Sequence, residues 1–224
     1  SIVHKAPFRE ALYLLTDGEE LKKELDIGKP ASRFYPDKSQ TVQKDVQRVP
    51  ELLEQAGYQG ETLVLGVLNY VQAGEKGVWL QKRAAEYGIN LELQTRSFEV
   101  DFYSEEFEKE THMMMLGDIP VTDRELSFID FCSNPNLSCQ RFFSAEIVNS
   151  LNKKIERMKF CEHYEQRLQE YEAIDQWLTE NYFLVYYYHP EKKELVHPTV
   201  KQQGSDPVGK LNLRTVWVEW GNYK

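Results

Sequence analysis

Cysteine is scarce in this sequence, and long apolar runs are missing. The cysteines are Cys132, Cys139 and Cys161, and no Cys-x-x-Cys pair occurs, which argues against a zinc site. Because their number is odd, at least one thiol stays outside any disulfide, which fits a reducing compartment better than a secreted one. The spacing alone still permits a bridge between Cys132 and Cys139. No apolar run is long enough to span a bilayer, so we predict no transmembrane helix.

Catalytic signatures are also missing. The sequence contains no Gly-x-Gly-x-x-Gly, no Walker loop, no Gly-x-Ser-x-Gly elbow and no His-Glu-x-x-His. Its histidines are scattered along the chain, at His4, His112, His163, His189 and His197. We therefore predict that the protein is not an enzyme and has no catalytic residues, no metal and no cofactor.

Positive charge is in short supply. The chain has 36 acidic and 27 basic residues, for a net charge of −9 and a pI near 5.2. That balance argues against binding of nucleic-acid phosphate or of an anionic membrane by this chain itself. The hydrophobic content of 41% suffices for a proper core. The first residues do not resemble a signal peptide, so we expect a mature form or an excised piece.

A strand–helix–strand unit organises the chain. Residues 62–68 form a short apolar run rich in β-formers, typical of a buried strand. A polar loop over 69–74 follows, and then apolar residues at helical spacing over 75–87. Gly88 can end that helix in the left-handed conformation, and residues 89–94 alternate as a second strand. Two strands joined by one helix predict parallel pairing with a right-handed crossover.

This topology predicts where a ligand would bind. In parallel α/β sheets, ligands lie beyond the carboxyl ends of the strands. Here that places them at the 69–74 loop and at the turn that follows a third expected strand over 112–116. The polar and aromatic residues predicted to bind a ligand at these loops are Asn69, Tyr70, Gln72, Asp118 and Arg124.

Helices and turns are expected on either side of this unit. The helices are a first one opened by Pro7, a second capped by Asp17, a third over 41–56 that Pro50 kinks or restarts, a short one within 98–110, one capped by Ser144 and one over 164–178. Two loops are expected: one over 31–40, whose length is typical of binding loops, and one over 127–143. Strands are expected over 182–188 and 211–219.

Four segments in order resemble one protein family. Leu52 to Tyr58 reads Leu-Leu-Glu-Gln-Ala-Gly-Tyr, and it is similar to the "LL-x-x-AGY" signature of solute-binding protein family 5, the oligopeptide- and dipeptide-binding type. Lys5 to Leu12 resembles the helix that opens the second lobe in that family. Gly88-Ile89 and the segment Asp206 to Lys210 resemble further family motifs, so the resemblance covers nearly the whole chain.

The resemblance implies an α/β fold, the second lobe of a type II periplasmic-binding-protein-like (Venus flytrap) fold with a mostly parallel sheet flanked by helices. Residues 1–195 would form lobe II, and residues 196–224 would be the return segment and closing strand toward a first lobe that this sequence lacks. A small-molecule solute would bind between the two lobes.

One branch of the family resembles the chain further. Met115 to Phe128 and Leu211 to Trp217 are similar to segments of SgrR-type transcriptional regulators. This implies a cytoplasmic regulator that senses a small polar solute such as a sugar phosphate. Its partners would be lobe I and a fused amino-terminal DNA-binding domain of the same chain, with DNA bound only through that domain and no membrane.

The alternative implied by the family is an extracellular lipoprotein that delivers peptides to an ABC transporter. Transport members usually carry Gly-Trp and then an Asp after the third strand, and that Asp holds the amino terminus of a bound peptide. Here Gly117 is followed by Asp118 with no tryptophan. Asp118 is the nearest match, and the departure disfavours peptide binding.

Overall fold

The computed structural model describes residues 1–25, 28–68, 73–97, 104–117, 124–133, 139–191, 196–201, 204 and 214–219. The α-helices are α1 (Ala6–Leu15), α2 (Gly18–Leu25), α3 (Val49–Ala56), α4 (Ala73–Glu86), α5 (Glu105–Glu110), α6 (Arg124–Ser133), α7 (Ala145–Lys159) and α8 (Tyr164–Glu180). The strands are β1 (Lys29–Pro30), β2 (Leu63–Leu68), β3 (Leu91–Arg96), β4 (Met113–Met115), β5 (Tyr188–His189), β6 (Val200–Lys201) and β7 (Trp217–Val218). Single 3-10 turns occur at Ile2–His4, Pro36–Lys38, Val46–Arg48 and Cys139–Phe142.

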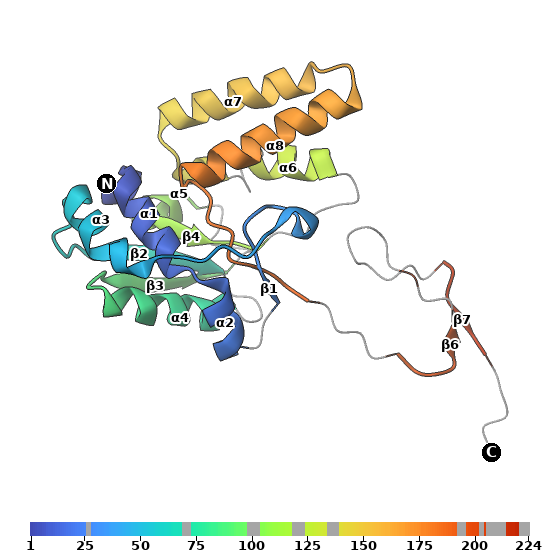
Figure 1. The fold of residues 1–224 in the computed structure, drawn as a ribbon, viewed down its shortest axis with the longest axis horizontal. Coiled ribbons are helices and arrows are strands. Elements are labelled where there is room, and N and C mark those ends of the chain that lie inside the picture. Colours follow the sequence, from blue (N-terminus) through green and yellow to red (C-terminus); the bar gives the residue numbers. More distant parts are fainter. Residues whose placement is uncertain are drawn as a thin grey trace.

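A parallel three-stranded sheet in the order β3-β2-β4 lies at the centre (Figure 1). β2 pairs with β3 from Leu63↔Leu91 to Leu68↔Arg96, and with β4 from Leu65↔Met113 to Val67↔Met115. The predicted strand–helix–strand unit is therefore confirmed, with α4 as the connection. Gly88 has φ +76°, the left-handed conformation expected at the end of this helix.

The buried side chains form two main clusters. The first joins α1, α3 and α4 to the sheet, and the second joins α6, α7 and α8 to Tyr35. Figure 1 shows α7 and α8 side by side on one flank of the molecule, with α6 beneath them and the sheet beyond. Between the two clusters runs the segment that follows β1.

The helix caps form as the sequence indicates. The Asp17 carboxylate accepts the backbone N–H groups of Glu19 and Glu20 at 2.8 and 3.2 Å and opens α2. The Ser144 hydroxyl accepts the N–H of Ile147 at 3.4 Å and opens α7. These contacts satisfy N–H groups that have no partner within the helix.

The third predicted helix was too long. Residues 41–45 lie outside any helix, and α3 begins only at Val49 with Pro50 in its first turn. Proline cannot donate inside a helix but is tolerated in the first turn, so the restart was the correct alternative. Val42, within the predicted helix, is 45% exposed.

The predicted loop over 127–143 was also wrong. α6 occupies most of its first half, and a 3-10 turn lies at Cys139–Phe142. Phe128 is fully buried, with its ring 4.7 Å from that of Tyr171 in an edge-to-face arrangement. Cys132 is a buried thiol and is not part of a disulfide, so the bridge that spacing permitted does not form.

The two late strands are shorter than predicted. Of 182–188, only Tyr188 belongs to a strand, β5, which pairs antiparallel with β1. Of 211–219, Trp217–Val218 pairs antiparallel with Val200–Lys201, whereas residues 205–213 lie outside the described residues. Within the described part of the chain, no helix is both long enough and apolar enough to cross a bilayer.

Candidate functional site

The three parallel strands end at one edge of the sheet. Because β2, β3 and β4 run the same way, the carboxyl ends at Leu68, Arg96 and Met115 lie along that edge. Of the predicted ligand-binding residues, Asn69, Tyr70, Gln72 and Asp118 lie outside the described residues. Arg124 is the first residue of α6, and its side chain is not described. The ligand-binding set from the sequence therefore stays a prediction.

Helix α4 begins at this same edge and packs closely against β2. A Cβ on Gly77 would approach the Cγ2 atom of Val67 to 3.0 Å, so the missing side chain permits the close contact. A Cβ on Gly74 would meet nothing within 4 Å, which shows open space beside the first turn. The amino terminus of α4 carries a partial positive charge from its aligned peptide dipoles.

A buried cation lies in this first turn. Lys76 is only 4% exposed, and its Nζ atom donates a hydrogen bond to the phenol oxygen of Tyr188. The same Nζ atom lies 4.2 Å from the centroid of the Tyr188 ring. No carboxylate of the described residues pairs with it; the nearby Glu75 acts only at longer range. Lys76 thus holds a positive charge, together with a phenol, beside the carboxyl end of β2.

Burial sets the ionisation of both groups. Burial lowers the pKa of the Lys76 ammonium, and the Glu75 carboxylate opposes that shift. Burial likewise raises the pKa of the Tyr188 phenol. An anion placed beside Lys76 would favour its charged form, since an opposite charge at close range stabilises it.

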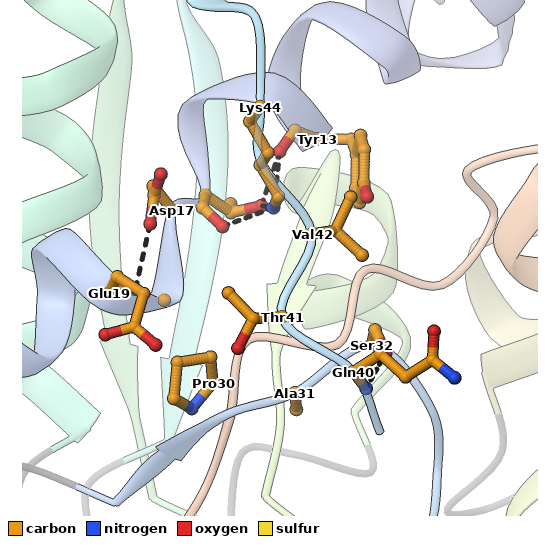
Figure 2. A pocket seen from close by; sticks show the side chains of 12 residues that line it. Tyr13, Asp17, Glu19, Pro30, Ala31, Ser32, Gln40, Thr41, Val42 and Lys44 are labelled. Carbon is orange, nitrogen blue, oxygen red and sulfur yellow. Dashed lines mark hydrogen bonds between the residues drawn. The ribbon is translucent and has the colours of Figure 1, made fainter. Parts of the chain in front are cut away.

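A small pocket lies beside Pro30, the strand partner of Tyr188. Tyr188 pairs with Pro30 across β1 and β5, and Pro30 lines a small pocket between the α1–α2 corner and residues 40–44. Its volume is about 20 Å³, which is room for about one water molecule. Figure 2 shows Lys44 at one side of this pocket, with its amine directed at Tyr13 and the end of α1.

Lys44 caps the carboxyl end of α1. Its Nζ donates to the carbonyl of Tyr13 at 2.8 Å, to the hydroxyl of Thr16 at 2.9 Å and to the Thr16 carbonyl. Burial lowers the pKa of this ammonium to about 7, while the charge of Asp17 opposes the shift. All three donors are used within the fold. Lys44 is therefore a structural anchor for the extended segment and not a free ligand-binding group.

The most catalysis-like pair in the described residues is a serine and a histidine. Ser39 Oγ lies 2.9 Å from His189 Nε2. The same oxygen accepts the N–H groups of Ser32 and Arg33, each at 3.2 Å. A hydroxyl that ties a loop together in this way is poorly placed to act as a nucleophile. Among the described residues no cluster of His, Cys, Asp and Glu could hold a metal ion.

Sequence reasoning missed Lys76 and Tyr188. Lys76 precedes Leu80 by four residues and Trp79 by three, so it lies on the apolar face of α4. A lysine at an apolar position of a helix was the available signal. Tyr188 was visible only as part of an aromatic run, and its pairing with β1 is a long-range contact.

No family model matches the chain, although one curated protein resembles it over most of its length. The uncharacterized protein YhjP of Bacillus subtilis (strain 168) is 24% identical over 220 residues, which is 94% of this chain and 36% of that protein. The chain thus spans about a third of that relative.

Solved structures resemble the chain over nearly its whole length. The ABC transporter substrate binding protein CtaP from Listeria monocytogenes superposes with a TM-score of 0.74 at 17% identity, over 97% of this chain and 48% of that one. A dipeptide binding protein from Pseudoalteromonas sp. SM9913, in complex with Met-Leu, gives a TM-score of 0.74 at 15% identity, over 96% and 45%.

These superpositions establish the fold. The chain has the α/β, type II periplasmic-binding-protein-like fold that the sequence predicted, with a parallel sheet flanked by helices. It spans about half the length of each of these structural neighbours. A particular closeness to SgrR-type regulators stays a prediction.

Proposed function

We propose that this chain is the second lobe of a two-lobed solute-binding protein, and that the carboxyl-end edge of the β3-β2-β4 sheet faces the bound solute. The observation that carries the proposal is the position of Lys76. This buried cation lies with Tyr188 at the edge where parallel α/β sheets bind ligands. Solute-binding neighbours that match nearly all of this chain, and about half of their own length, support it.

In the proposed mechanism, the first lobe supplies the opposite wall of the cleft. A solute that contacts both lobes favours the closed state, because it gains interactions there that the open state lacks. Lys76 and the amino terminus of α4 would attract an anionic or acceptor group of the solute. Residues 196–224 would return to the first lobe as the closing strand. The predicted residues Asn69, Tyr70, Gln72, Asp118 and Arg124 would line the same edge.

We further propose a cytoplasmic regulator, in which closure on a small polar solute such as a sugar phosphate repositions a fused DNA-binding domain. Two observations support this setting: the resemblance of Met115 to Phe128 and of Leu211 to Trp217 to SgrR-type regulators, and the odd cysteine count. DNA would be bound only through that domain.

The alternative is a substrate-binding lipoprotein of a peptide ABC transporter. Two structural neighbours favour it: CtaP is an ABC transporter substrate binding protein, and the protein in complex with Met-Leu is a dipeptide binding protein. The amino-terminal sequence of the full-length protein separates the two settings. A helix-turn-helix segment indicates the regulator, and a lipoprotein leader indicates the transport receptor.

A thermal-shift series on the full-length protein tests ligand binding. Glucose 6-phosphate and the dipeptide Met-Leu serve as probes of the two classes. A ligand at a hundred times its Kd is expected to add about 2.7 kcal/mol to the free energy of unfolding. Stabilisation by the sugar phosphate alone supports the sensor, and stabilisation by the dipeptide alone supports the receptor. No stabilisation by either class, nor by wider sets of phosphates and peptides, contradicts the proposal.

A further inference from the structure

A groove lies between the two hydrophobic clusters, and none of the residues that line it belongs to the β3-β2-β4 sheet. Its walls come from Tyr13 on α1, from residues 32–42 and from the segment that ends α8, Thr179 to Tyr186. Its volume is about 340 Å³, at the lower end of the range for small-molecule sites, which favour junctions between packed units. All of the residues that line it belong to the part of the chain that the structure describes.

One wall of the groove is aromatic, and one of its residues has a strained backbone conformation. The rings of Tyr13 and Tyr182 lie 5.1 Å apart, centroid to centroid. Tyr182 has φ +55°, the left-handed conformation that glycine normally supplies just after a helix. Its N–H bonds to the Thr179 carbonyl at 3.0 Å, and the N–H of Phe183 bonds to the Leu178 carbonyl at 2.9 Å. This pair of bonds closes α8 as a Schellman motif, with a tyrosine at the position where glycine costs least.

The phenol of this strained residue is partly buried. Burial and the nearby Glu10 carboxylate both raise the pKa of the Tyr182 phenol, so the ring is held neutral beside Tyr13. A residue that keeps a costly backbone conformation in order to place an aromatic ring in a groove is the kind of outlier that accompanies binding sites.

The lining of the groove also includes a guanidinium. Arg33 Nη1 donates to the Thr179 hydroxyl at 2.7 Å and lies 3.9 Å from the Asp175 carboxylate. That carboxylate is 5% exposed and also accepts the Tyr186 hydroxyl at 2.7 Å. Among the described residues, Thr179 and Asp175 are the only hydrogen-bond and ion-pair partners of the Arg33 side chain, which is 32% exposed. A guanidinium has five N–H donors, so Arg33 has donors to spare in the groove.

We propose that this groove is a second binding site, and that it takes a small anion attached to a ring, which is either a phosphate or a carboxylate. The ring would lie against Tyr13 and Tyr182, since flat rings pack favourably on aromatic faces. The anion would meet the spare donors of Arg33, whose planar fork matches both phosphate and carboxylate. Lys38, paired at 2.8 Å with the exposed Glu172, would add positive charge at the rim.

Calorimetric titration of the full-length protein tests the site with four probes. Phenyl phosphate and benzoate carry both a ring and an anion, whereas inorganic phosphate and phenol each carry one half. The site predicts that at least one of the first two binds, and that both half-probes bind at least tenfold more weakly. If phenyl phosphate binds more tightly, the preferred anion is a phosphate. If benzoate binds more tightly, it is a carboxylate. Equal binding of a half-probe, or no binding of either complete probe, overturns the proposal.

Two variants locate the binding. Arg33→Lys keeps the positive charge beside Asp175 but removes the planar guanidinium. The affinity for the more tightly bound probe is expected to fall about tenfold. Tyr182→Gly removes the ring while it relieves the backbone, so the fold is retained and affinity falls by a similar factor. Arg157→Lys is the matched control, because Arg157 pairs with Glu170 far from the groove. Unchanged affinity in both groove variants, or an equal loss in the control, overturns the site.

Discussion

The ammonium of Lys44 lies 4.0 Å from the centroid of the Tyr13 ring and donates to the carbonyl of that same residue at 2.8 Å. One side chain thus contacts the face of an aromatic ring and the carboxyl end of the helix that bears it. Both contacts favour a cation, the first through the ring quadrupole and the second through the helix dipole. Burial acts against them and lowers the pKa of Lys44 to about 7.

This burial predicts a stability that rises with pH. The ordinary pKa of lysine is 10.5, so between about pH 7 and pH 10 the unfolded chain keeps a proton that the folded chain has released. Stability therefore increases with pH over this window, by up to about 1.4 kcal/mol per unit for a group of this kind. Above pH 10 the trend reverses, because burial raises the pKa of the Tyr186 and Tyr187 phenols, which then ionise first in the unfolded chain.

Urea unfolding from pH 6 to pH 10 measures this dependence. Lys44→Met removes the titrating group, so the rise below pH 10 is expected to flatten even if the variant is less stable overall. Lys76, whose pKa burial also lowers, leaves a smaller residual rise. An equal slope in wild type and variant would show that Lys44 is not the group responsible.

The next prediction separates the roles of Lys76 in stability and in binding. Lys76→Met replaces a buried ammonium by an apolar chain of similar length, a change that is often nearly neutral because the cost of burying the charge disappears. We expect the free energy of unfolding to change by about 1 kcal/mol or less. Affinity for an anionic solute is expected to fall about tenfold or more, since charged hydrogen bonds contribute about 1.5–3 kcal/mol.

Lys82→Met is the matched control for this experiment, because Lys82 is exposed on the same helix. Calorimetry with whichever solute stabilises the full-length protein gives the affinities, and urea unfolding gives the stabilities. If the Lys76 variant binds that solute as tightly as the control does, Lys76 is not part of the site.

Two glycines should respond to alanine in opposite directions. A Cβ on Gly66 in β2 would lie 2.7 Å from the Cζ atom of Phe107 and 2.9 Å from the Cγ2 atom of Thr111, both on or beside α5. Gly66→Ala is expected to destabilise the fold by about 1–3 kcal/mol through overpacking. Gly74→Ala, in the open first turn of α4, is expected to add about 0.5–1 kcal/mol. Thermal unfolding of both variants measures the difference, and a stabilising Gly66→Ala would refute the packing.

The helical cluster is tested at Phe128. Its ring is fully buried against Phe34 and Tyr171, so Phe128→Ala should cost about 3–5 kcal/mol. Leu126, on the same helix, is 60% exposed, and Leu126→Ala should change stability by about 0.5 kcal/mol or less. Urea unfolding gives both values. Equal effects at the two positions would mean that residues 124–133 are not packed as described.

Local patterns in the sequence were enough to predict the central unit. The apolar run of β2, the helical spacing of α4 and the left-handed Gly88 are all set by neighbours within a few residues. The caps at Asp17 and Ser144 are equally local, because each side chain bonds to an N–H two or three residues along. The fold class followed from these elements and from the family resemblance.

Contacts between distant segments decided the rest. Residues 41–45 follow a helical pattern in sequence, yet they lie outside any helix where Lys44 reaches back to Thr16, 28 residues away. Residues 127–133 were predicted to be part of a loop, and Phe128 is buried against the rings of Phe34 and Tyr171, which come from segments far away in the sequence.

The sequence by itself determined the parallel unit, and with it the sheet edge at which we predict solute binding, because both follow from periodicity and chain order. Only the tertiary structure placed Lys76 against Tyr188, 112 residues apart, and brought Arg33 and Tyr182 to one groove. No local pattern encodes such pairs. They form when separate hydrophobic faces pack and bury a few polar groups together, and those groups must then find partners in whichever segment lies nearest.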